Sequence, residues 1–199
     1  MAKSREDGAD DVTGLMVALP LERLARLLRA GEHSQGLNPA QWEALRYFRR
    51  ANRFSNSPGA LTQYLGATKG TVSQTLKALA QKELIAKATR EGEKRSVAVQ
   101  LTDKGSAALA LDPWTRLASD TEALGGKTRR RMARGLGELL QSEIKRAALP
   151  SFGSCTSCRF FREKGRDGDP RGPHACMLFE EPVASSETEL SCVGHQARL

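Results

Sequence analysis

The chain has 199 residues, of which 39% are hydrophobic and 5% are aromatic, and its formal net charge is +8. This length suffices for one ordinary domain with a small appendage, and the hydrophobic content excludes a wholly disordered chain. Residues 150–199 hold six Lys or Arg against seven Asp or Glu, so the excess positive charge belongs to residues 1–149. A basic first part favours a polyanionic partner such as nucleic acid.

The sequence contains neither a membrane span nor a secretion signal. No stretch approaches the roughly 18 to 20 consecutive apolar residues that a membrane-spanning helix needs. The apolar run 15–19 is short, follows an acidic segment and lacks the basic start of a signal peptide. We therefore expect a cytoplasmic protein with no membrane partner, in a reducing compartment that disfavours disulfides.

The first 50 residues predict a disordered start followed by two helices. Residues 1–13 are polar and of mixed charge, so we expect them to be disordered. A helix is predicted from Leu15, with Pro20 near its first turn. Its apolar stripe comprises Leu21, Leu24, Leu27 and Leu28. Asn38-Pro39 opens a second helix, whose aromatic residues we assign to the core: Trp42, Tyr47 and Phe48.

The stretch 60–79 predicts a helix, a tight turn and a second helix. Gly66 supplies the turn, and Thr68 caps the second helix. Apolar residues recur in that helix at i, i+4 and i+7 and define one buried stripe: Val72, Leu76 and Leu79. The opposite face, centred on Gln74, is small, hydrogen-bonding and basic, which suits a DNA major groove.

A short β-hairpin is predicted directly after this helix-turn-helix. Residues 86–89 and 96–101 resemble strands, and the polar segment between them contains Gly92. A hairpin at this place makes the winged version of the motif, in which the tip reaches the minor groove or the DNA backbone. The basic residues of this wing are Arg90, Lys94 and Arg95.

Three segments carry a resemblance to the MarR-type winged-helix regulators: GLNPAQWEALRYF, ALTQYLGATKGTVSQTLKALAQKELI and KRSVAVQLTDKG. The resemblance spans Gly36 to Leu111, and its final Leu-Thr-Asp-Lys-Gly is particularly similar to that family. It implies a homodimer whose terminal helices interlock and whose two recognition helices read a pseudo-palindromic site in double-stranded DNA. By analogy, the Leu21 and Leu136 stripes form the dimer interface. The family's wing often ends in Asp-Arg-Arg, whereas this one reads Glu-Gly-Glu-Lys-Arg.

We assign DNA contacts to the exposed face of the second helix and to the wing. Gln74 is expected to read a base, because an amide side chain pairs bidentately with adenine. Lys69 and Lys77 are expected to meet phosphates, and the wing residues should add affinity and salt dependence more than selectivity. The full set is Thr68, Lys69, Thr71, Ser73, Gln74, Lys77, Arg90, Lys94 and Arg95.

Helices are predicted again between the wing and Pro150. One begins at Asp103, a break falls at Asp112-Pro113, and a long amphipathic helix opens at Thr128 and ends at Pro150. Four arginines crowd the start of the long helix: Arg129, Arg130, Arg131 and Arg134. They form either a solvated face or a contact with DNA phosphate near the dimer axis.

Residues 150–199 form a separate module that contains all four cysteines, Cys155, Cys158, Cys176 and Cys192. The segment is too polar to build a core without a staple, and clustered cysteines in a reducing compartment favour a metal centre. The spacing C-x2-C-x17-C-x15-C supplies four ligands, for which His174 or His195 are possible substitutes.

The identity of the metal remains open between zinc and iron. Structural zinc commonly uses two close ligand pairs, and only one exists here. The order Cys-x-x-Cys-x-Phe-Phe, His-x-Cys-x-x-Phe-x-x-Pro and a lone Cys is similar to small modules that hold a 4Fe-4S cluster, in which Phe160, Phe161 and Phe179 would limit solvent. We favour an iron-sulfur cluster over zinc.

The sequence thus predicts a mainly α-helical winged helix-turn-helix protein with a two-stranded β-wing, long terminal dimerisation helices and a small loop-rich Cys-ligated module. Its parts are a disordered segment at residues 1–13, a DNA-binding and dimerisation domain at 14–149, and the cysteine module at 150–199. We expect a transcriptional regulator, with repression the favoured mode, whose DNA binding follows the redox or iron status of the centre. The effector, if a small molecule, is unknown.

Two alternatives remain. One is a regulator that responds to a small ligand and keeps zinc as a passive staple. The other is a redox enzyme that uses the winged helix only to dock on nucleic acid. Catalysis fits poorly, because a zinc deaminase needs a His-x-Glu element before its Cys-x-x-Cys pair, and no Ser/His/Asp set or phosphate-binding loop is evident. We therefore expect no enzymatic activity.

Overall fold

The structure, a computed structural model, describes residues 12–33, 35–90 and 93–198, with the side chains of residues 89, 90 and 93–96 outside the description. Most of the predicted disordered start, residues 1–11, lies outside it. The helices of the described part are α1 (Gly14–Gly31), α2 (Pro39–Arg50), α3 (Pro58–Leu65), α4 (Lys69–Gln81), α5 (Asp103–Leu109), α6 (Pro113–Glu122) and α7 (Gly126–Arg146).

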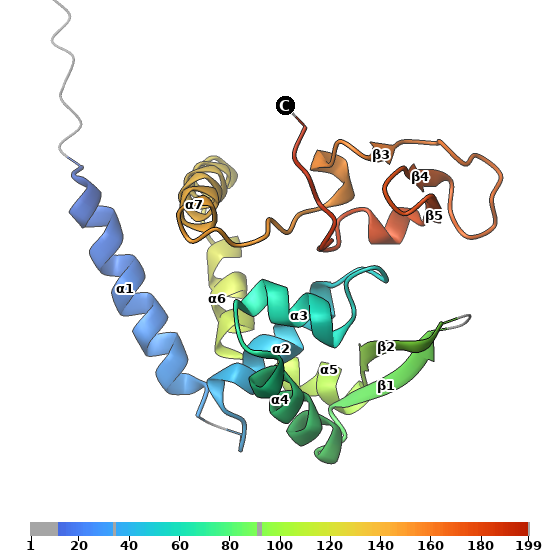
Figure 1. The fold of residues 1–199 in the computed structure, drawn as a ribbon. Coiled ribbons are helices and arrows are strands. Elements are labelled where there is room, and N and C mark those ends of the chain that lie inside the picture. The colour runs from blue at the N-terminus through green and yellow to red at the C-terminus, as the bar shows by residue number, and fades with distance from the viewer. Residues whose placement is uncertain (1–11, 34, 91–92, 199) are drawn as a thin grey trace, which may run out of the picture.

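Helices α2 to α5 pack around one hydrophobic core (Figure 1). Asn38 caps α2 by accepting from the Gln41 backbone N–H at 2.9 Å, and the Gln41 side chain completes a capping box. The predicted aromatic core is confirmed, because Trp42 is 0% exposed and Tyr47 is 1% exposed. This core holds the helix-turn-helix in place.

The helix-turn-helix follows the predicted pattern. Helix α3 begins at Pro58, slightly earlier than the sequence indicated, and ends at Gly66, whose φ of +59° is the left-handed conformation that glycine tolerates best. Thr68 caps α4 by accepting from the Thr71 N–H at 3.2 Å. The predicted stripe is buried, with Val72, Leu76 and Leu79 at 2%, 1% and 0% exposed.

Strands β1 (Ile85–Arg90) and β2 (Glu93–Leu101) form the predicted antiparallel hairpin, with Ile85 opposite Leu101. The register shifts between Thr89 and Arg90. The Val99 N–H of β2 donates to the Asn56 carbonyl at 2.7 Å, so the base of the wing is tied to the loop between α2 and α3.

The two longest helices carry apolar side chains that this chain does not cover. Leu28 is the buried residue of α1, and none of the α7 residues is buried. The exposed apolar residues of these helices include Leu15, Leu19, Leu24, Leu27, Met132, Leu136, Leu139 and Leu140. None of the described helices has the length and apolar character to cross a membrane.

Three helix boundaries differ from the prediction. Pro20 lies in the second turn of α1 rather than the first, where the ring costs one backbone hydrogen bond. Helix α7 begins at Gly126, ahead of Thr128, because glycine is tolerated at a helix start. It ends at Arg146 rather than at Pro150, since Ala148 turns to a φ of +51°.

The cysteine module is loop-rich and contains a three-stranded sheet: β3 (Phe161–Arg162), β4 (His174–Cys176) and β5 (Glu181–Val183). Both strand pairs are antiparallel, and Phe161 lies opposite Cys176. Two short 3₁₀ turns, η1 (Cys155–Ser157) and η2 (Ser185–Glu187), complete it. Figure 1 shows the module beside α3, on the side of the molecule from which the chain leaves α7.

Candidate DNA-binding face and cysteine centre

The outer face of α4 carries every residue that the sequence assigned to it. Thr68, Lys69, Thr71, Ser73, Gln74 and Lys77 are all exposed. The Thr68 and Thr71 hydroxyls lie 2.9 Å apart, so these two side chains are engaged with each other at the helix start. Gln74 and Lys77 lie further along the same face. The face is therefore polar, basic and accessible over its full length, as a groove-binding helix requires.

The wing places its basic residues on the two paired strands. Arg90 is the last residue of β1, and Lys94 and Arg95 lie near the start of β2. Their side chains are outside the described part of the structure, so the assignment of DNA contacts to them stays a prediction. The same holds for the arginines of α7, of which Arg130, Arg131 and Arg134 are exposed and Arg129 pairs with Glu122.

The fold brings the four cysteines together from three separate parts of the module. Cys155 and Cys158 flank the η1 turn, Cys176 ends β4, and Cys192 bridges to Gly153 through its backbone N–H at 2.9 Å. Three are buried, at 6%, 8% and 7% exposed for residues 155, 158 and 192, and Cys176 is half-buried. All four are free thiols.

The electrostatics of these thiols reflect their closeness. Burial, and then the charges of Cys192, Cys176 and Cys158, raise the pKa of Cys155 to about 12. Burial also raises the pKa of Cys192, and the nearby Asn52 and Ser55 side chains and the Gly194 backbone act in the opposite direction. Four thiolates at this place would repel one another, and a bound cation is the ordinary way to offset that repulsion.

Zinc and iron-sulfur centres require different spacings of their cysteine sulfurs. Tetrahedral zinc with Zn–S bonds of about 2.3 Å needs sulfurs about 3.8 Å apart. Among the described residues, no three His, Cys, Asp or Glu side chains meet to hold a single ion. A 4Fe-4S cluster binds one cysteine at each iron, so its four sulfurs stand further apart than around one zinc.

Both histidines of the module have their ring nitrogens engaged elsewhere. His174 accepts from the Lys164 backbone N–H at 3.1 Å through Nδ1, and its Nε2 lies 3.1 Å from the Ser185 hydroxyl. His195 lies between two serine hydroxyls, 3.0 Å from that of Ser151 and 2.9 Å from that of Ser157. These contacts give both rings a structural role and favour the cysteines as ligands.

Two of the three phenylalanines assigned to the centre pack beside it. Phe161 is 7% exposed and belongs to the same small core as Cys155 and Cys158, with Phe160 against it. Phe179 lies elsewhere: its ring stacks on Phe54 of the α2–α3 loop, with centroids 4.4 Å apart and planes at 10°. Phe179 therefore serves the contact between the module and the winged helix.

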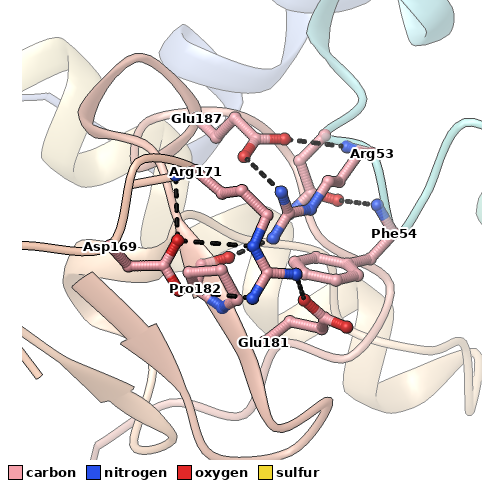
Figure 2. A network of polar contacts seen from close by, with 8 residues as sticks. Arg53, Phe54, Asp169, Arg171, Glu181, Pro182 and Glu187 are labelled. Atoms are coloured by element: carbon pink, nitrogen blue, oxygen red, sulfur yellow. Dashed lines mark hydrogen bonds and ion pairs between the residues drawn. The ribbon is translucent and has the colours of Figure 1, made fainter. Parts of the chain in front are cut away.

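The cysteine module packs against the α2–α3 loop, residues 51–57. Figure 2 shows Arg53 bonded to the Pro182 carbonyl and to the Glu187 carboxylate, with an N···O distance of 3.7 Å for the ion pair. Close by, Arg171 links Asp169 and Glu181 within the module at 3.2 and 3.1 Å. The loop thus meets the module through an ion pair, a carbonyl and an aromatic stack.

Backbone hydrogen bonds join the same two segments around Cys192. The Ser191 N–H donates to the Arg50 carbonyl at 2.6 Å, and the Asn52 N–H donates back to the Ser191 carbonyl at 3.0 Å. The Val193 N–H donates to the Ser55 hydroxyl at 2.7 Å. Cys192 is therefore held between two residues that are both bonded to the loop. Nothing in the sequence signalled this junction, because its partners are about 140 residues apart and carry no shared motif.

A second feature that sequence reasoning missed is a charged cluster between α1, α2 and α6. Glu32 is 1% exposed and pairs with Arg46 at 2.7 Å, and Arg46 also pairs with the buried Asp112 at 3.0 Å. The Trp114 indole donates to Glu32 at 3.0 Å. Beside this cluster lies a cavity of about 700 Å³, whose lining includes Arg46, Arg49, Arg50, Tyr64 and Trp114.

Comparison with known proteins agrees with the winged-helix interpretation. Residues 35–96 match the model of the MarR family. Over this stretch the chain is similar to the MarR family. The matched MarR stretch runs from before α2 into β2 and ends well before the first cysteine.

Solved structures share this MarR-type fold at low sequence identity. A point mutant of MepR from S. aureus superimposes with a TM-score of 0.51 at 18% identity, covering 66% of this chain and 98% of that one. The transcriptional regulator SlyA gives a TM-score of 0.51 at 13% identity, covering 65% of this chain and 94% of that one. No curated protein sequence gives a match.

Proposed function

We propose that this protein is a DNA-binding transcriptional regulator whose C-terminal cysteines hold a metal centre that controls DNA binding. The observation that carries the proposal is the junction between the two parts. Four thiols converge next to the loop that leads into the helix-turn-helix, and Cys192 is bonded into that loop on both sides. A structural change at the cysteines would therefore reach the DNA-binding helices through this one loop.

The DNA-binding half of the proposal rests on α4 and on the charge of the chain. An exposed polar and basic helix on a buried apolar stripe, followed by a wing, suits insertion into a major groove with the wing at the flank. Gln74 reads a base in this scheme, and Lys69 and Lys77 meet phosphates. SlyA, which shares the fold, is a transcriptional regulator.

A homodimer accounts for the uncovered apolar faces of α1 and α7. Side chains such as Leu24 and Leu136 are 42% and 41% exposed, and each belongs to a row at helical spacing. A second copy of the chain would cover both rows and would set two recognition helices at a fixed separation, which matches a pseudo-palindromic site. In such a dimer, the exposed arginines of α7 from both copies would belong to one surface.

For the centre itself, we propose a 4Fe-4S cluster held by Cys155, Cys158, Cys176 and Cys192. The convergent thiols, the apolar cover from Phe160 and Phe161, and the engagement of both histidines elsewhere support it. Such a cluster supplies a one-electron couple and is sensitive to oxidants. The chain's own residues then act as the switch: without the metal the module loses its staple, and the α2–α3 loop loses the surface against which it is ordered.

The test uses Cys155→Ala in the full chain. The substitution removes one ligand from a buried position on the module and leaves the winged helix unchanged, so metal content should fall while the fold of residues 14–146 persists. DNA affinity should then match that of metal-free wild type and differ from that of the loaded protein. If the variant lost its metal but bound DNA like the loaded wild type, the centre would be only structural.

The cavity beside Arg46 favours a second function, a regulator that responds to a small ligand and keeps the cysteines as a staple. Its lining combines Tyr64 and Trp114 with three arginines and the carboxylates of Glu43 and Asp112. Because Arg46 pairs with Asp112, Arg49 and Arg50 are the groups that would meet an aromatic anion. The two functions separate in one titration. Aromatic carboxylates would change the DNA affinity of metal-free protein under the second function and leave it unchanged under the first.

A further inference from the structure

The Asn52 side chain is buried beside the cysteine centre with one hydrogen-bonding group unused. Asn52 is 1% exposed, and its Nδ2 has no hydrogen-bond partner among the described residues. A buried amide donor without a partner costs about 1–3 kcal/mol. An unpaired group of this kind in a well-packed place calls for an explanation.

The orientation of this amide is fixed by its neighbours. Its Oδ1 accepts from the Phe54 backbone N–H at 3.1 Å and from the Ser55 hydroxyl at 2.9 Å. A backbone N–H can only donate, so the oxygen must face it and the NH₂ group must point the other way. Rotating the amide by half a turn would place two donors against each other. Nδ2 is thus held in its unpaired position by two contacts that the loop itself provides.

The unpaired Nδ2 belongs to the loop that holds the chain on both sides of the fourth cysteine. The Asn52 N–H bonds to Ser191 and the Ser55 hydroxyl bonds to Val193, so the residues on both sides of Cys192 are tied to this loop. Ser55 donates its single hydroxyl proton to Oδ1 of Asn52, so Nδ2 is the donor of this pair that has no acceptor among the described residues.

We propose that Asn52 donates a hydrogen bond through Nδ2 to the sulfur of Cys192 when that sulfur is a metal-bound thiolate, and so acts as a positioning residue of the centre. This inference rests on the proposed metal centre. A neutral thiol accepts hydrogen bonds weakly, whereas a ligating thiolate accepts them well. The donor is supplied by the α2–α3 loop of the winged helix, so the loop senses directly whether the sulfur is charged and bound. When the centre holds its metal, Nδ2 has a hydrogen-bond acceptor. When the metal is lost, Nδ2 is again without an acceptor.

The test compares two substitutions in the full chain purified without oxygen. Asn52→Asp keeps the oxygen that accepts from Phe54 and Ser55 but replaces the donor by a second oxygen. Arg53→Ala is the control, because it removes contacts between the same loop and the module, to Glu187 and Pro182, and leaves both contacts that orient the Asn52 amide in place. If Asn52→Asp does not fold, the neutral and similarly sized Asn52→Leu replaces it. The readouts are the rate of iron release to a chelator and the midpoint reduction potential of the centre.

We expect release from the Asn52 variant to be at least about tenfold faster than from wild type, as for other residues that hydrogen-bond to metal ligands. Its reduction potential should shift to a lower value, because a donor to the sulfur favours the more negative reduced state. Arg53→Ala should change both the release rate and the potential much less. Equal effects of the two substitutions, or none from Asn52, would overturn the inference and leave the metal centre standing. Wild-type protein without bound metal would instead overturn the proposed function.

Discussion

Replacing Phe54 by alanine should loosen the cysteine module from the winged helix without unfolding either. The Phe54 ring stacks on Phe179 at 4.4 Å, and the Arg53 guanidinium lies 4.7 Å from the same ring. An aromatic pair contributes about 0.5–1.5 kcal/mol beyond its buried area, and half-burial of a phenylalanine contributes about 1 kcal/mol more. The substitution should therefore weaken docking by about 2 kcal/mol, roughly 30-fold at about 1.4 kcal/mol per factor of ten.

Hydrogen exchange measures this loosening at amides that join the two parts. The N–H groups of Ser191 and Val193 donate across the junction, so their exchange should accelerate roughly 30-fold in Phe54→Ala while amides of α4 keep their protection. Phe179→Ala should behave alike, and the double variant should show a coupling of about 0.5–1.5 kcal/mol between the two rings. Additive effects within about 0.3 kcal/mol would refute the reasoning, because the rings would then not stabilise docking through their mutual contact.

Three further substitutions test other parts of the molecule. Gln74→Ala should cost about 1–3 kcal/mol of DNA-binding free energy at preferred sites and relax the sequence preference, which binding-site selection measures. Lys77→Ala should weaken binding to all sites alike and lower the slope of log affinity against log salt by about 1, which salt titrations measure. Equal losses of affinity on every sequence for both variants would refute the assignment. Gly105→Ala should destabilise the fold by at least about 2 kcal/mol in urea unfolding, because its Cβ would lie 2.0 Å from a backbone oxygen. Gly59→Ala should be neutral or better by up to about 1 kcal/mol, because its Cβ would make only an ordinary contact, at 4.0 Å, with the Ser57 hydroxyl. Leu136→Glu should yield monomers in sedimentation experiments if α7 forms the dimer interface, and an unchanged dimer would place that interface elsewhere.

Most of the winged helix could be predicted because its signals are local. The cap at Thr68, the turn at Gly66 and the stripe from Val72 to Leu79 each follow from residues within one or two turns of the helix. The hairpin after them likewise follows from alternation and a glycine. The errors concern Pro20, which lies inside α1, and the two ends of α7, where Ala148 adopts a conformation that neighbouring residues permit but do not dictate.

The junction could not be predicted, because its contacts are long-range and their residues are ordinary. Asn52, Arg53 and Phe54 look like any polar loop between two helices. They hold the module through contacts with Glu187, Phe179 and Ser191. These partners are so far along the chain that no sequence motif links them to the loop. The buried Glu32 was equally hidden, since its partner Arg46 resembles a surface arginine until the helices pack.

The most direct test of the central claim measures DNA affinity with the centre loaded and empty. Protein purified without oxygen should absorb visible light and contain iron and sulfide, and removing the metal should change its affinity for one selected operator by at least about tenfold, which is about 1.4 kcal/mol. The Cys155→Ala variant should have the metal-free affinity under both conditions. A colourless protein without iron, or equal affinities for the loaded and empty forms, would contradict the account.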